Sequence, residues 1–131
     1  MVRITGFDHL VLRVADVERS LAWYCGVLGL APVRVDEWRR GEVPFPSVRI
    51  DEGTIVDLMV RRPADAATDT RVLDHLCLVV EAGTDLAALA ASGAFEVDQG
   101  PVDGRFGARG LATSLYVRDP DGIVVELRTY G

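Results

Sequence analysis

One seven-residue pattern occurs twice in the chain, and this repeat limits the possible folds more than any other feature. Residues 8–14 read DHLVLRV and residues 74–80 read DHLCLVV. The two histidines of these segments, His9 and His75, stand 66 positions apart and are the only histidines in the sequence. Self-similarity at a fixed spacing indicates a duplicated supersecondary unit. The chain is therefore predicted to consist of two copies of one module.

Each repeat is followed by a segment with helical spacing. In the first copy Asp16 is placed as the N-cap and Gly29 as the stop. The apolar stripe between them consists of Val17, Leu21, Tyr24 and Leu28. In the second copy a shorter helix is expected after Thr84-Asp85, ending at Ser92-Gly93. A strand followed by a helix thus opens both copies.

The ends of the two copies also match. Residues 51–58 read DEGTIVDL and residues 120–127 read PDGIVVEL, which align at an offset of 69. Glu-Gly and Asp-Gly between alternating segments are hairpin signals. Each copy therefore reads strand, helix, strand, strand, strand. The predicted fold class is α+β, with two tandem βαβββ modules forming a curved mixed sheet.

The 131 residues suit a single domain, and half of them (49%) are hydrophobic. We expect module one at about 5–62, a polar linker at about 63–72 and module two at about 73–131.

Charge and cysteine content narrow the function classes. A formal net charge of −6 with scattered arginines argues against a nucleic-acid partner. The apolar runs are too short to span a membrane and no leader segment is expected, so a cytoplasmic protein is expected. Cys25 and Cys77 lack the spacing of a zinc or redox pair and are expected to be small buried hydrophobes.

Strand alternation places the chemically interesting side chains together. His9 and His75 alternate with leucines that must face the helices, and so do Asp57 and Glu126 in the closing strands. All four therefore lie on the helix-free face, at matching positions in the two modules. Two imidazoles with one or two carboxylates suit a divalent ion of Zn, Ni, Mn, Fe or Co. The alternative is that each histidine is an ordinary strand-end residue bonded to a neighbour.

The same alternation indicates which residues face a substrate. Ser47, Arg49 and Tyr116 are the candidate substrate residues, although Arg49 at a hairpin end is also compatible with a solvated edge position. Residues 103–111, DGRFGARGL, are compatible with either a mobile lid carrying arginines or a long hairpin. Residues 38–42, WRRGE, at the corresponding loop of module one, are compatible with the same two alternatives.

Over essentially its whole length the chain resembles the vicinal oxygen chelate superfamily, which includes glyoxalase I, fosfomycin- and bleomycin-resistance proteins, methylmalonyl-CoA epimerase and extradiol dioxygenases. The matching stretches are residues 8–30, residues 74–80 and RDPDGIVVEL at 118–127. The resemblance implies sheets that form a cup around a divalent metal. It also implies a homodimer in which each cup combines the first module of one chain with the second module of its partner.

Carried over by position, the family's metal ligands fall on His9, His75 and Glu126. Asp57 stands at the position where glyoxalase I has a Glu, and it is expected to serve as a fourth ligand or as a base. Asp57 and Glu126 are therefore the candidate catalytic carboxylates.

The expected function is that of a metal-dependent enzyme acting on a small oxygen-rich molecule. The two reaction classes left open are a glyoxalase-like lyase or isomerase and an extradiol-type dioxygenase. The alternative is a protein that binds an antibiotic or toxin and sequesters it without turnover. The sequence leaves the metal and the substrate open.

Overall fold

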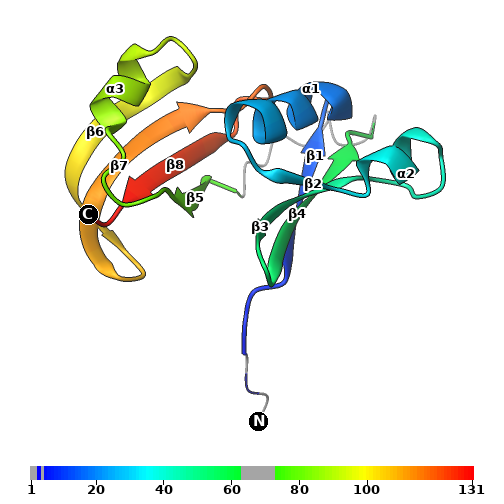
Figure 1. The fold of residues 1–131 in the computed structure, drawn as a ribbon, viewed down its shortest axis with the longest axis horizontal. Helices are drawn as coiled ribbons and strands as arrows, with labels where there is room; N and C mark the ends of the chain where they lie inside the picture. The colour runs from blue at the N-terminus through cyan, green and yellow to red at the C-terminus, as the bar shows by residue number, and fades with distance from the viewer. Residues whose placement is uncertain (1–2, 4, 63–72) are drawn as a thin grey trace. The chain divides into compact units, whose positions relative to one another are not determined.

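The computed structural model describes residues 3, 5–62 and 73–131. It divides the chain into two compact units, Met1–Asp69 and Thr70–Gly131, which are called module one and module two below and are described separately (Figure 1). The predicted linker at 63–72 lies outside the described residues.

Module one is a four-stranded mixed sheet with helices on one face. Its sheet order is β1-β4-β3-β2, with β1 parallel to β4 and the other pairs antiparallel. The helix after the first strand begins where predicted, because the Asp16 carboxylate accepts a hydrogen bond from the Arg19 amide at 3.1 Å. In chain order the elements are β1 (His9–Val14), α1 (Val17–Leu21), the π-helix η1 (Ala22–Val27), β2 (Ala31–Val33), α2 (Val35–Arg39), β3 (Ser47–Asp51) and β4 (Thr54–Val60).

Module two repeats this topology. The sheet order is β5-β8-β7-β6, again with the first and last strands of the module parallel. The helix after Thr84-Asp85 is present as predicted, and Asp85 caps α3 by accepting a hydrogen bond from the Ala88 amide at 3.0 Å. The elements are β5 (His75–Val79), α3 (Leu86–Ala91), β6 (Glu96–Gly107), β7 (Gly110–Arg118) and β8 (Val124–Thr129). The predicted α+β class with two βαβββ modules is confirmed, and each module contributes its own four-stranded mixed sheet.

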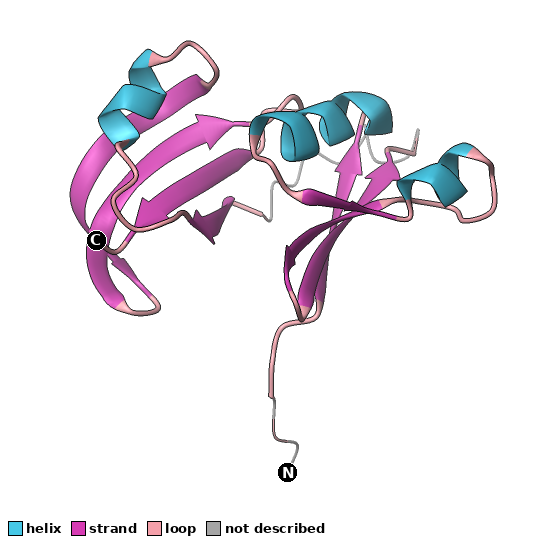
Figure 2. Ribbon diagram, in the orientation of Figure 1, coloured by secondary structure: helices cyan, strands magenta, loops and turns pink. Residues whose placement is uncertain are grey.

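Figure 2 shows helices lying on one side of the sheet in each module. The hydrophobic core of each module lies between the two layers. In module one α1 packs against β4, and in module two α3 packs against β6 and β7. Most of the buried apolar strand side chains come from the alternating positions that face the helices, as strand periodicity requires. These include Leu12, Val14, Val56 and Leu58 in module one, and Leu115, Val117, Val125 and Leu127 in module two.

The modules differ between their second and third strands. In module one β2 has three residues and is followed by α2, whereas in module two β6 has twelve residues and turns directly into β7. Residues 103–111 therefore form a hairpin, which was one of the two predicted alternatives.

Residues 38–42 do lie in the corresponding connection, between β2 and β3, but this connection is partly helical. They contain the end of α2 and the turn after it. Asp36 and Glu37 in the first turn of α2 and Arg39 in its last turn complement the helix dipole and favour a helix there.

Of the helices in the described part of the chain, none is long and apolar enough to cross a membrane.

Candidate metal and substrate site

The helix-free face of module one carries a histidine–carboxylate pair. His9 Nε2 lies 3.9 Å from Asp57 Oδ2. Asp57 is buried, and its other oxygen, Oδ1, accepts a hydrogen bond from the Ser47 hydroxyl at 2.6 Å. Ser47 and Asp57 meet because they are directly opposite in the β3–β4 register. One carboxylate oxygen is therefore held by Ser47 while the other faces the imidazole.

Module two carries the equivalent pair with more partners. His75 Nε2 lies 3.7 Å from Glu126 Oε1. The other oxygen, Oε2, accepts from the Cys77 thiol at 2.9 Å and lies 3.3 Å from Arg128 Nη1. Tyr116, opposite Glu126 in the β7–β8 register, also interacts with this carboxylate through its side chain. Glu126 thus keeps one oxygen facing the imidazole while the protein engages the rest of the group.

The aspartate before each histidine explains the repeated Asp-His dipeptide. Asp8 Oδ2 lies 2.7 Å from His9 Nδ1, and Asp74 Oδ2 lies 2.6 Å from His75 Nδ1. An ionised carboxylate can only accept a hydrogen bond, so Nδ1 is the donor in both pairs. This tautomer directs the Nε2 lone pair of a neutral imidazole toward the carboxylate of the closing strand. Metal-binding histidines are commonly oriented by a carboxylate on their other nitrogen, so each pair has the donor chemistry of a divalent-metal site.

The charges around these groups shift their proton affinity. The hydrogen bond to Asp8, opposed by desolvation and supported by the charge of Asp57, raises the pKa of His9 above its ordinary value. Burial tends to raise the pKa of Glu126, but the bonds from Cys77 and Tyr116 and the charge of Arg128 outweigh it, so the net pKa is lowered. Glu126 is therefore held as a carboxylate.

The expectation that both cysteines are small buried hydrophobes is wrong. Cys25 is half-buried, and Cys77 is exposed although its thiol is part-buried against Glu126. The alternation of β5 places Cys77 on the helix-free face, where the thiol finds a carboxylate acceptor. Partial burial, with the bond to Glu126 and its negative charge, raises the pKa of the Cys77 thiol to about 12.

The three predicted substrate residues, Ser47, Arg49 and Tyr116, differ from one another in their surroundings. The Tyr116 ring makes an edge contact with the His75 ring, with centroids 5.9 Å apart, and Arg105 lies over the Tyr116 ring at 5.8 Å. Ser47 lies beside Asp57 but is fully buried. Arg49 instead donates to the carbonyl oxygens of Asp51 and Glu52, at 3.1 and 3.2 Å, in the β3–β4 turn. The structure thus brings Tyr116 and Ser47 to the carboxylates and engages Arg49 at the hairpin end.

Sequence reasoning missed Arg128. This arginine is only 4% exposed, and it stands two residues after Glu126 on the same face of β8. The period of two that placed Glu126 could also have placed Arg128. Arg128 Nε and the hydroxyl of Ser114, its partner in the β7–β8 register, are buried without a hydrogen-bond partner among the described residues.

Within the described residues no three His, Cys, Asp or Glu side chains are grouped closely enough to hold a metal ion. Each module supplies one histidine–carboxylate pair, so the four predicted ligands are divided equally between the modules.

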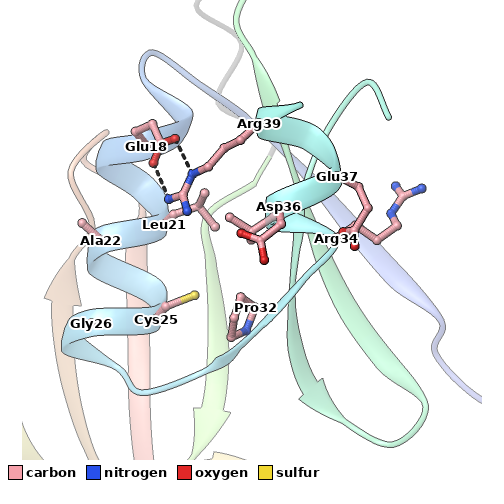
Figure 3. A pocket seen from close by; sticks show the side chains of 11 residues that line it. Glu18, Leu21, Ala22, Cys25, Gly26, Pro32, Arg34, Asp36, Glu37 and Arg39 are labelled. Carbon is pink, nitrogen blue, oxygen red and sulfur yellow. Dashed lines mark hydrogen bonds and ion pairs between the residues drawn. The ribbon is translucent and has the colours of Figure 1, made fainter. Parts of the chain in front are cut away.

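A cavity of about 510 Å³ in module one lies away from these pairs, between the α1–η1 helix and the segment around α2 (Figure 3). None of its lining residues is a predicted site residue. The ion pair of Glu18 with Arg39, at 2.8 Å, connects its two sides.

Comparison with known proteins agrees with this architecture. The Virulence protein STM3117 of Salmonella typhimurium is 29% identical to this chain, over 97% of the chain and 85% of that protein. A probable lactoylglutathione lyase of Vibrio parahaemolyticus is 27% identical, over 91% of the chain and 86% of that protein. Among solved structures, the integron cassette protein VCH_CASS1 from the V. cholerae mobile metagenome has a TM-score of 0.73 and 28% identity, covering 100% of this chain and 99% of that one.

The family model of the Glyoxalase/Bleomycin resistance protein/Dioxygenase superfamily matches residues 6–127. This range contains both Asp-His strands and both closing strands, and the chain belongs to this superfamily.

Proposed function

We propose that the protein is a divalent-metal-dependent enzyme that acts on a small oxygen-rich molecule as a glyoxalase-like lyase or isomerase. The observation that carries the proposal is the duplicated histidine–carboxylate pair, in which an aspartate directs each imidazole. The likeness to proteins named lactoylglutathione lyase favours this branch. An extradiol-type dioxygenase would need a further histidine as acid or base, and the sequence holds only His9 and His75.

The proposed metal ligands are His9, His75 and Glu126, with Asp57 as the second carboxylate beside the ion. A bound metal would act as a Lewis acid and stabilise negative charge on substrate oxygens. Bringing the four groups to one ion requires one pair from each module. We propose that the pairs come from two chains of a homodimer with shared sites, as the family resemblance implies.

The two carboxylates differ in what surrounds them, and this suggests different roles. Glu126 is paired with Arg128 and its pKa is lowered, which makes it a persistent anion and a weak base. Asp57 receives a single neutral hydroxyl, from Ser47, on one oxygen. Its other oxygen remains available to accept a proton from a substrate carbon. We therefore assign Glu126 as a ligand and Asp57 as the base, with Tyr116 orienting the substrate.

Metal content tests the proposal first. Protein purified without chelator or affinity tag is expected to contain stoichiometric metal by elemental analysis, and His75→Ala is expected to lose it while keeping its circular dichroism spectrum. His75 is exposed at a strand start and packs little, so the substitution spares the core. Glu18→Gln, which changes a carboxylate on the helix side of module one, is the matched control and is expected to keep the metal. Full metal stoichiometry in His75→Ala would remove the assignment.

Turnover separates the enzyme from a sequestering protein. Formation of lactoylglutathione is the first reaction to assay, because the similar lyases carry it in their name. Asp57→Asn is expected to retain metal and lose turnover. Stoichiometric ligand binding without turnover, unchanged when His9 and His75 are substituted, would instead support sequestration.

A further inference from the structure

Arg128 is a buried cation whose contacts join two parts of module two. Its side chain is 4% exposed, and it starts on β8, the strand that carries Glu126. Nη1 donates to Glu126 Oε2 at 3.3 Å and to the Phe106 carbonyl at 3.1 Å, and Nη2 donates to the Arg105 carbonyl. Both carbonyls belong to β6, which is separated from β8 by β7. One guanidinium therefore reaches past a strand and ties the β6–β7 hairpin to the carboxylate.

The hairpin is shaped to receive this guanidinium. The β6–β7 ladder has register shifts on both sides of Val102, and regular pairing resumes at Arg105 and Phe106, close to the hairpin turn. A Cβ atom at Gly107 would overlap the Arg128 guanidinium, so a side chain there would displace it. The Tyr130 ring lies 5.4 Å from the Arg128 guanidinium and covers it.

We propose that Arg128 is a positioning residue that holds Glu126 Oε2, so that Oε1 alone is offered toward His75 and to the metal, and that it couples Glu126 to the β6–β7 hairpin. The role of Arg128 toward a metal rests on the proposed function, whereas the coupling of Glu126 to the hairpin does not. Module one has no such device, because Met59 occupies the position equivalent to Arg128 at the offset of 69. The guanidinium fork suits this task, since it bonds a carboxylate and carbonyls at the same time.

Metal affinity provides the first test. Arg128→Met introduces the residue that module one has at this position. Methionine is similar in length to the arginine stem, so this substitution introduces no steric clash in the buried site. Its affinity for Zn²⁺ by titration calorimetry is expected to fall about 10- to 100-fold, the usual effect of losing a residue that orients a ligand. Arg128→Lys, which keeps the charge but not the fork, is expected to restore part of the affinity. Arg118→Met is the matched control, because Arg118 bonds Asp98 and the Gly122 carbonyl and not Glu126.

Hydrogen exchange in metal-free protein tests the coupling independently of any metal. Amides of residues 103–111 are expected to exchange faster in Arg128→Met and in Glu126→Gln, and the double variant is expected to exchange no faster than Arg128→Met. Such non-additivity is the mark of groups that act as one unit. Arg118→Met is expected to leave this segment unchanged.

The two measurements separate the two proposals. Wild-type protein that takes up no metal would end the proposed metal function, while faster, non-additive exchange would still support the tie between Arg128, Glu126 and the hairpin. Unchanged Zn²⁺ affinity in Arg128→Met would overturn the positioning role, and unchanged or additive hairpin exchange would overturn the coupling.

Discussion

The two modules share a frame and differ on the face that carries the candidate site. In module one Asp57 lies between Val11 and Ser47, its partners in the β1–β4 and β3–β4 registers, and Met59 follows two residues later. No arginine stands at these positions.

In module two the equivalent positions hold chemically active side chains. Cys77 and Tyr116 are the register partners of Glu126, and Arg128 follows two residues later. Apolar side chains facing the helices must interlock, so they resist change, whereas side chains on the other face can diverge. Duplication has thus left two matching cores and two unlike carboxylates.

The largest expected difference between the modules concerns the carboxylates themselves. Glu126→Ala leaves the buried Arg128 charge without its carboxylate, and breaking a buried pair in this way costs about 3–5 kcal/mol of unfolding free energy. Asp57→Ala leaves only the buried Ser47 hydroxyl unpaired, at about 1–3 kcal/mol. Urea unfolding of both metal-free variants measures the difference. Equal losses of unfolding free energy in the two variants would contradict the difference between the surroundings of Glu126 and Asp57.

The cores should respond alike. Leu58 and Leu127 are equivalent at the offset of 69 and are both almost fully buried. Leu58→Ala and Leu127→Ala are each expected to cost about 2–5 kcal/mol, because each deletes buried methyl groups and leaves a cavity. The same urea experiment checks both. A loss in one module and none in the other would show that only one core supports the fold.

The hydroxyl groups opposite the carboxylates give a smaller contrast. Ser47→Ala removes the hydroxyl that holds Asp57, and a hydrogen bond to a charged group contributes about 1.5–3 kcal/mol. Tyr116→Phe is expected to cost less, since Glu126 keeps Cys77 and Arg128 as partners. Thermal unfolding of the two variants compares them. A larger loss for Tyr116→Phe would reverse the interpretation.

The smallest expected effect concerns α2, a helix that has no counterpart in the described part of module two. The bidentate bond from Arg39 in α2 lowers the pKa of Glu18 in α1. A carboxyl whose pKa is lower in the folded state contributes stability above its unfolded pKa and loses it as pH falls through the folded value. An NMR titration is therefore expected to give a Glu18 midpoint below the ordinary glutamate value. Arg39→Gln is expected to raise that midpoint, and an unchanged midpoint would show that the pair is not formed in solution.

Much of the architecture follows from local patterns. Asp16 as an N-cap predicted the first helix start, and the second helix was expected after Thr84-Asp85. In the structure both Asp16 and Asp85 bond an amide three residues away. The period of two predicted that His9 and Asp57 share a face, as the pair distance of 3.9 Å bears out. The insertion of α2 was missed because a short helix between strands has little periodicity to reveal it.

The sequence by itself determined the repeat, the topology and the faces on which the histidines and carboxylates lie, because these follow from side-chain periodicity along the chain. The tertiary structure alone decided what surrounds each carboxylate. Arg128 meets the carbonyls of Arg105 and Phe106 only because β8, β7 and β6 pair in one sheet, and Cys77 meets Glu126 only through the β5–β8 register. Contacts between residues more than twenty positions apart depend on strand pairing, which no local pattern specifies.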